Sequence, residues 1–190
     1  MKERVGIPTD QIIEVVNRHG FDNFGFVPVR DFVFQKSFYD ACATNQCGKF
    51  DTNWSCPPGV GSYEDLVARI QSFHQGLVLQ SVGAISGSFD FEGMLQCEKQ
   101  HNSTLRSLVD DLYPLLGSAR KVTLSAGACS LCKECTYLER EPCPMPEKAF
   151  GALEAHGVDV AALLGRCGLK YNNGPNTVSY VAVVLFDSGV

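Results

Sequence analysis

The chain has 190 residues, of which 45% are hydrophobic and 19% are charged, a composition typical of a folded globular protein and not of a disordered one. Its 16 basic and 21 acidic residues give a formal net charge of −5, which argues against a nucleic-acid partner because such proteins present a basic surface. The longest uncharged stretches, residues 75–89 and 171–186, are interrupted by Gly, Ser, Asn or Pro, so neither is expected to span a membrane.

The first half of the chain predicts two helices and two strands around an irregular loop. Residues 9–19 have helical periodicity, with a capping aspartate near the start and a glycine just after the end. Residues 42–61 lose all periodicity among Gly, Pro, Asn and Asp, which is typical of an irregular loop. The other elements predicted in this half are a strand at 24–29, a helix at 62–73 and a strand at 77–85.

The second half predicts a long helix, two short helices and two strands. The long helix covers residues 92–116. Six residues share its apolar side: Cys97, His101, Leu105, Leu108, Leu112 and Leu115. A β-branched and aromatic run at 178–186 is typical of a central strand. The remaining elements are a strand at 121–125 and short helices at 146–155 and 158–167.

Together these elements predict the α/β (α+β) class. We expect one compact domain over residues 1–190, with a sheet of about four strands flanked by helices. Two cysteine-rich loops, at 42–61 and 127–146, interrupt the regular elements.

The nine cysteines are the most informative part of the composition. Their number is odd, and residues 1–4 lead into a polar amphipathic segment instead of the hydrophobic stretch of a secretion signal. A secreted disulfide framework is therefore not expected, and we expect a cytoplasmic protein. In a reducing compartment, clustered cysteines bind metal or take part in redox chemistry.

The loop at 127–146 has a cysteine spacing typical of iron–sulfur proteins. Cys129, Cys132 and Cys135 form a Cys-x2-Cys-x2-Cys run, and Cys143 follows after seven residues and precedes a proline. Thiolates at every third residue of a tight loop can bind three corners of a cubane cluster, and the last cysteine can return to the fourth. Zinc usually takes its ligands as two separated pairs, so it is the alternative metal. The spacing predicts a [4Fe-4S] cluster.

Three more cysteines, Cys42, Cys47 and Cys56, form a looser group in the loop at 42–61. They can hold three corners of a second cluster or three positions on zinc, so we expect one or two clusters. Cys97 is a possible fourth protein ligand of this site. Cys143, water or a small ligand are the alternatives, and an iron without a protein ligand would suit a catalytic site.

Five further features have a structural and a chemical interpretation. Cys97 and Cys167 lie in predicted helices, where buried cysteines usually pack as small apolar residues. Glu154 and Asp159 can act as acid or base, but an acidic residue beside a helix start is more often a cap. The turn at 172–176 precedes the last strand and can also line a pocket.

Three cysteine-bearing segments resemble the DUF2284 family of predicted metal-binding proteins. They are Trp54-Ser-Cys56-Pro-Pro58, Gly127-Ala-Cys129-x2-Cys132-x2-Cys135 and Pro142-Cys143-x2-Pro146-Glu-Lys148. A segment at 153–160 continues the similarity, which spans roughly residues 42–186 in order. The resemblance implies metal binding, of iron–sulfur type, by seven cysteines: Cys42, Cys47, Cys56, Cys129, Cys132, Cys135 and Cys143.

The chain also departs from this family. Members tend to carry Ser-Met before the glutamate and often a cysteine two residues after it, whereas this chain has Ala152-Leu153 before Glu154 and His156 after it. A shorter segment, residues 19–26, is similar to the start of the cobalamin-dependent epoxyqueuosine reductases, which also carry ferredoxin-type clusters.

Three functions are consistent with these observations. The first is an iron–sulfur protein that transfers electrons or supports a redox partner protein. The second is a redox enzyme in which a three-cysteine cluster leaves one iron open for a substrate, or for a corrinoid or flavin partner. The third is a structural zinc protein in which the metal closes the loops. The sequence indicates neither a substrate nor an oligomeric state.

Overall fold

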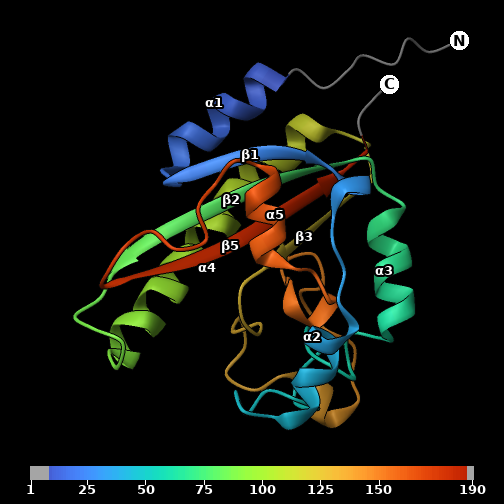
Figure 1. The fold of residues 1–190 in the computed structure, drawn as a ribbon. Helices are drawn as coiled ribbons and strands as arrows, with labels where there is room; N and C mark the ends of the chain where they lie inside the picture. The colour runs from blue at the N-terminus through green and yellow to red at the C-terminus, as the bar shows by residue number, and fades with distance from the viewer. Residues whose placement is uncertain (1–8, 188–190) are drawn as a thin grey trace, which may run out of the picture.

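A five-stranded mixed sheet forms the centre of the structure, a computed structural model that describes residues 9–187 (Figure 1). The strands are β1 (Asn23–Pro28), β2 (Gln75–Ala84), β3 (Lys121–Ser125), β4 (Gly151–Ala152) and β5 (Thr177–Phe186). They lie in the order β1-β2-β5-β3-β4, with only β3 and β4 parallel. This arrangement confirms the α+β class and the central position predicted for the last strand.

Helices cover both faces of this sheet. On one face lie α1 (Thr9–His19) and α4 (Phe91–Leu116), and on the other lie α3 (Tyr63–Gln71) and α5 (Val160–Arg166) (Figure 1). The short helix α2 (Lys36–Ala41) leads into the first cysteine loop. Within residues 9–187 there are also four 3-10 helices: η1 (Val29–Asp31), η2 (Cys42–Thr44), η3 (Thr136–Glu139) and η4 (Glu154–His156).

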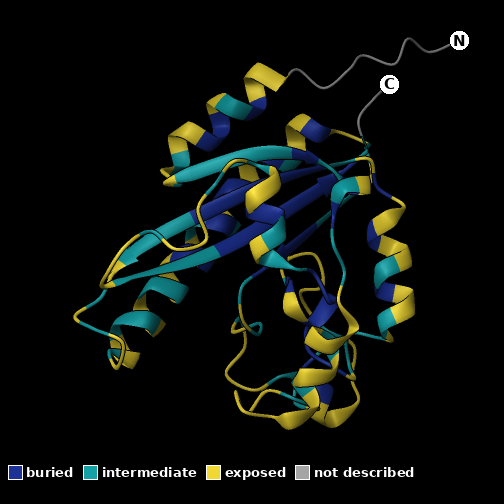
Figure 2. Cartoon of the chain, in the orientation of Figure 1, coloured by how far each residue is buried: buried dark blue, intermediate teal, exposed yellow. Residues whose placement is uncertain are grey.

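Alternate residues of the long strands enter two separate hydrophobic clusters. Leu77 and Leu79 of β2 pack with α1 and α4, whereas Val78 packs with α3 and α5, because successive side chains of a strand point to opposite faces. In β5, Val184 and Val183 divide in the same way. Figure 2 shows the buried residues concentrated in the sheet, while the cysteine loops are mostly exposed or half-buried. The sheet and its helices therefore supply the core.

Most of the predicted elements are confirmed, with small differences at their ends. The helix at 9–19 and the strand at 121–125 have the predicted bounds. The Ser62 hydroxyl caps α3 by accepting a hydrogen bond from the Asp65 N–H at 3.3 Å. Asp159 caps α5 by accepting from the Ala162 N–H at 2.9 Å, which confirms its interpretation as a cap.

The segment 146–155 is not the short helix that its pattern predicts. It contains turns, the two-residue strand β4 and the start of η4. Because β4 pairs with the end of β3, at Leu124–Gly151 and Ser125–Ala152, the sheet has five strands instead of about four. This pairing joins residues far apart in the chain, so local periodicity does not reveal it.

The apolar side of α4 also differs at its last turn. Leu115 is 37% exposed, whereas Leu116 is buried. The buried stripe runs from Leu108 through Leu112 to Leu116, in steps of four residues. A helix with 3.6 residues per turn allows steps of three or four, and the prediction used a step of three at this point.

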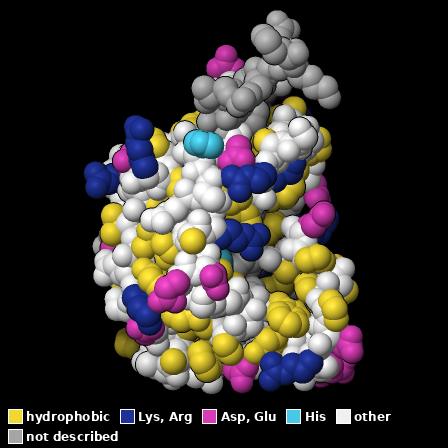
Figure 3. All heavy atoms as spheres, turned by 90° about the vertical axis from the view of Figure 1, so that its right-hand side faces the viewer, with side chains coloured by type: hydrophobic (Ala, Val, Ile, Leu, Met, Phe, Trp, Pro, Cys, Tyr) yellow, Lys and Arg dark blue, Asp and Glu magenta, His cyan; other side chains and the backbone are white. Residues whose placement is uncertain are grey.

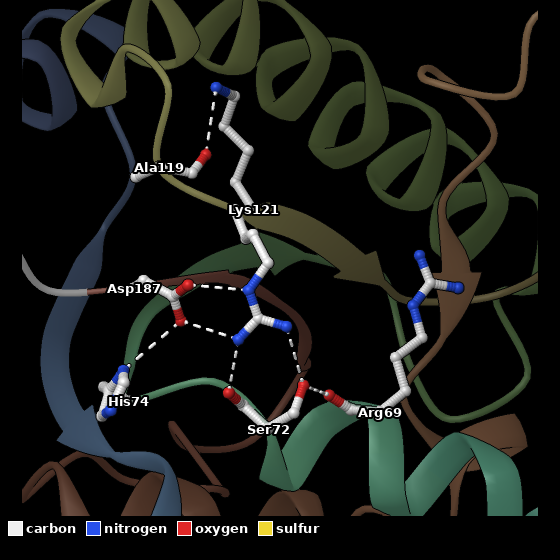
Figure 4. A network of polar contacts seen from close by, with 7 residues as sticks. Arg69, Ser72, His74, Ala119, Lys121 and Asp187 are labelled. Carbon is white, nitrogen blue, oxygen red and sulfur yellow. Dashed lines mark hydrogen bonds and ion pairs between the residues drawn. The ribbon is translucent and has the colours of Figure 1, made fainter.

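An ion-pair network closes the end of the sheet beside α3 (Figure 4). The Arg120 Nε lies 2.8 Å from Oδ2 of Asp187, and the guanidinium also donates to the Ser72 carbonyl at 2.7 Å. His74 lies 3.4 Å from the same carboxylate. The hydrogen bond from Arg120 holds the pKa of Asp187 below its usual value. The network thus joins the start of β3, the end of β5 and the end of α3.

The remaining expectations concern the surface charge, membrane-spanning helices, the N-terminal segment and the number of domains. On the face shown in Figure 3, acidic and basic side chains are intermixed and form no continuous basic strip. Within residues 9–187, no helix is long and apolar enough to cross a membrane. The polar segment at residues 1–4 lies outside the described residues. That the chain forms one domain stays a prediction.

Candidate metal centre

The two cysteine loops lie together at one end of the molecule, below the sheet in Figure 1. The backbone N–H of Cys129 donates to the Ser55 hydroxyl at 2.9 Å, across 74 positions of the chain. The indole N–H of Trp54 donates to the Glu141 carbonyl at 3.0 Å. Each of these contacts joins the first loop to the second, so the loops form a single unit.

Aromatic packing reinforces this junction. The Trp54 ring packs edge-on against the Tyr137 ring, with 4.9 Å between the ring centroids. The Tyr137 hydroxyl donates to the Asp51 carboxylate at 2.5 Å. Tyr137 also lies against Gly59, where an added Cβ would collide with the ring. A side chain from η3 in the second loop is therefore buried by the first loop.

The four thiols of the second loop line one small hollow. Cys129, Cys132, Cys135 and Cys143 surround it, together with Trp54, Leu131, Met145 and Ala149 among other residues. Burial raises the pKa of the Cys129 thiol, and the Leu131 N–H and the Arg106 guanidinium oppose that shift. Cys132 is exposed, and the other three cysteines are half-buried.

The three thiols of the first loop lie close enough to interact electrostatically. Burial raises the pKa of Cys42, and the neighbouring thiols of Cys56 and Cys47 raise it further, as does Glu154. Cys56 is buried, and burial raises the pKa of its thiol against hydrogen bonds from Asn53 and Ser55. Cys47 is exposed.

A buried polar turn holds the first loop in place. The side-chain oxygen of Asn53, Oδ1, accepts from the Ser55 N–H at 3.0 Å and from the Ser55 hydroxyl at 2.6 Å. The Asn53 amide donates to the Lys49 carbonyl at 3.1 Å. Sequence reasoning missed the roles of Asn53, Trp54 and Ser55. The signal that marks this segment is the single tryptophan of the chain, two residues before a cysteine.

The remaining two cysteines pack against glycines of the sheet. The Cys97 sulfur on α4 occupies the space that a Cβ at Gly83 would take. A Cβ at Gly25 would lie 2.8 Å from the Cβ of Cys167, which follows α5. Neither cysteine lines the hollow of the second loop. That Cys97 completes the first-loop site stays a prediction.

The donor chemistry of the second loop fits a cubane cluster, because four thiols around one hollow match the four thiolates that such a cluster requires. Within residues 9–187, no three His, Cys, Asp or Glu side chains are close enough together to hold a single metal ion such as zinc, whereas a cubane cluster binds each of its four thiolates to a different iron.

The predicted turn at 172–176 lines a larger cleft near the loops. This cleft also contains Glu154, Glu98 and Gly127, and its volume is about 750 Å³. Although Glu154 as a residue is exposed, desolvation of its carboxyl in the cleft raises its pKa. Because residues 172–176 line this cleft, the interpretation of the turn at 172–176 as a pocket wall is confirmed.

Comparison with known proteins identifies a family model. The model described as "Predicted metal-binding protein (DUF2284)" matches residues 25–186. No curated protein matches the chain.

Several solved structures of epoxyqueuosine reductases are similar to this chain at low identity. A selenomethionine-labelled epoxyqueuosine reductase has 11% identity and a TM-score of 0.46, covering 95% of this chain and 46% of that one. The enzyme from Bacillus subtilis has 12% identity and a TM-score of 0.45, covering 96% and 45%. The enzyme from Streptococcus thermophilus has 11% identity and a TM-score of 0.44, covering 96% and 46%. The chain thus spans less than half the length of these structures.

Proposed function

Because the chain belongs to the DUF2284 family of predicted metal-binding proteins, we propose that its second loop holds a [4Fe-4S] cluster through Cys129, Cys132, Cys135 and Cys143. The observation that carries this proposal is the single hollow that these four thiols line together. Four thiolates are the full ligand set of a cubane cluster. The function is electron transfer, or redox support for a partner protein, in the cytoplasm.

The residues around the thiols have separate roles in this function. When bound, a [4Fe-4S] cluster supplies one-electron transfer. Trp54, Leu131 and Met145 line the hollow and reduce the access of water to the thiols. The Leu131 N–H and Arg106 favour the thiolate of Cys129, the form that binds metal. Ser55 fixes the backbone at Cys129.

The first loop offers a second group of thiols, Cys42, Cys47 and Cys56. The thiols of Cys56 and Cys47 both raise the pKa of Cys42, which supports a shared site. We propose that this group holds a second cluster with one position open to a non-protein ligand. In that arrangement the chain would be a redox enzyme and not only an electron carrier.

Anaerobic purification with analysis of iron, acid-labile sulfide and zinc tests this function. We expect about four iron and four sulfide per chain from the second loop, and about eight of each when both loops are filled. A brown colour that fades on reduction with dithionite should accompany the iron. Zinc without iron would overturn the proposal and favour a structural metal.

Two cysteine variants assign the iron to a loop. Cys132→Ser should remove about four iron per chain, and Cys47→Ser should remove iron only if the first loop is filled. Both residues are exposed, so the loss of a packed side chain is small. Cys167→Ala is the matched control, because that thiol packs against Gly25 and should leave the iron content unchanged.

A further inference from the structure

A cleft of about 750 Å³ opens beside the entrance to the second cysteine loop. Its walls come from the start of α4, the turn at 171–176, the first half of β5 and the residues that follow β3. Ala126 and Gly127, directly after β3, lie at one end of the cleft. This volume is within the range of clefts that bind small organic ligands, about 300–1,000 Å³.

An unpaired edge of the central strand borders the cleft. β3 pairs only with the second half of β5, from Lys121–Phe186 to Leu124–Val183. In the described part of the chain, no strand pairs with residues 177–182 on that side. The reason is that β3 ends at Ser125 and the chain turns away into the cysteine loop. Backbone groups at such an edge are available to a ligand.

The charged residues of the cleft wall are all acidic. Glu98 of α4 and Glu154 of η4 line the cleft, and no Lys, Arg or His does. Among residues 9–187, neither carboxylate takes part in an ion pair. Lys49 and Lys99 lie near enough to act on Glu98 but are not part of the wall. A ligand in the cleft therefore meets two carboxylates and no wall cation.

Tyrosine and amide side chains complete the wall. Tyr171 and Tyr180 both line the cleft, and tyrosine rings attract cations. Asn172 and Asn176 add amide groups beside them. Carboxylates and aromatic rings together are typical of sites that bind ammonium or guanidinium groups, and they repel anions.

We propose that this cleft is a binding site for a small organic cation that carries an ammonium or guanidinium group. The site lies next to the metal loop without sharing its ligands. The Glu98 carboxylate lies against Gly127, where a Cβ would collide with it, and Gly127 is two residues before Cys129. The proposal does not depend on which metal the cysteines bind.

Isothermal titration of the full-length protein with agmatine and with tetramethylammonium tests this site. Butylurea, which has no charge, serves as the neutral comparison ligand. We expect saturable binding of at least one of the two cations and none of butylurea. Glu98→Gln and Glu154→Gln should each weaken binding about tenfold or more, because each removes a negative charge that attracts the cation.

Two further variants distinguish binding of the cation by the cleft wall from its attraction to the overall negative charge of the protein. Glu92→Gln removes an acidic residue of the same helix outside the cleft wall, so cation affinity should stay within about twofold at moderate salt. Tyr171→Leu alters an exposed residue and should weaken cation binding without a change in thermal stability. The proposal is overturned if neither cation binds, if butylurea binds as tightly as the cations, or if the variant with both Glu98→Gln and Glu154→Gln binds like the native protein.

Discussion

At the scale of single residues, two buried histidines stand apart from the cysteine chemistry. His101 on α4 is 1% exposed, with Nδ1 at 2.9 Å from the Ser81 hydroxyl and an edge-on contact with Phe21. His156 is 4% exposed, and its Nδ1–H donates to the Ala152 carbonyl at 2.7 Å. Burial lowers the pKa of each to about 4, so both rings are neutral in the native protein at neutral pH.

These histidines should make the protein less stable as the pH falls below about 6.5. Between pH 6.5 and pH 4 an unfolded histidine binds a proton that the native ring does not, so the free energy of unfolding decreases. We expect each histidine to contribute a loss of about 2 kcal/mol between pH 7 and pH 5. Urea titrations at the two pH values measure this loss.

The variant His101→Gln isolates one of the two contributions. Glutamine can lower stability at every pH, so the informative quantity is the difference between pH 7 and pH 5. That difference should shrink by about 2 kcal/mol in the variant. An unchanged difference would show that His101 takes up its proton in the native protein.

At the scale of elements, the contact between the two loops is the feature with the greatest consequence for the metal centre. The Ser55 hydroxyl accepts a hydrogen bond from the Cys129 N–H and donates one to the Asn53 side chain. Ser55 is only 3% exposed, so the hydroxyl that makes both hydrogen bonds is buried. Loss of a buried hydrogen-bonding group leaves its partners unpaired, which costs about 1–3 kcal/mol. The loops should therefore loosen together when this hydroxyl is removed.

Ser55→Ala should accelerate hydrogen exchange in the second loop, at residues 129–135, although the substitution is in the first. Ser130→Ala is the matched control, because Ser130 is exposed in the same loop as Cys129 and its exchange should match that of the native protein. Mass spectrometry of the exchanged peptides measures both. Equal exchange in the two variants would mean that the junction does not stabilise the second loop.

Elements with strong local patterns could be predicted from the sequence, and those that depend on tertiary contacts could not. The helix α4 and the strand β5 have long apolar patterns, and both are where the sequence predicts them. The helix α2 has no buried residue and hence no apolar periodicity, so the prediction omits it. The strand β4 has two residues and exists only through its pairing with β3.

The candidate site divides in the same way. The cysteine spacing singled out seven thiols, because ligand spacing is a property of the local chain. The meeting of the loops depends on contacts such as Ser55–Cys129, which no local pattern encodes. The cleft depends on where β3 ends relative to β5, and that is a property of the sheet.

At the scale of the whole molecule, the hydrophobic core and the metal loops are separate. Of the buried nonpolar residues, the loops contribute Cys56, Pro57 and Tyr137, while the two clusters on the sheet contain residues from the strands and helices. Burial of apolar area drives folding, so we expect the sheet to be stable without a metal. We expect the loops, which have few buried side chains, to depend on a bound metal for their order.

Removal of metal by a chelator should therefore loosen the loops and leave the sheet folded. Trypsin should cut the metal-free protein faster after Lys133 and Arg140, both exposed in the second loop. Far-UV circular dichroism should retain most of its native signal. A cooperative loss of that signal on metal removal would show instead that the metal and the core fold as one unit.

The place of β5 in the order of the chain has a consequence for synthesis of the protein. Both cysteine loops precede Thr177–Phe186, so they leave the ribosome before the strand that joins β2 to β3. Until β5 has emerged, the apolar side of α4 lacks its contacts with Ala182 and Val184. Completion of the core thus waits for β5, and both cysteine loops are available to bind metal before it.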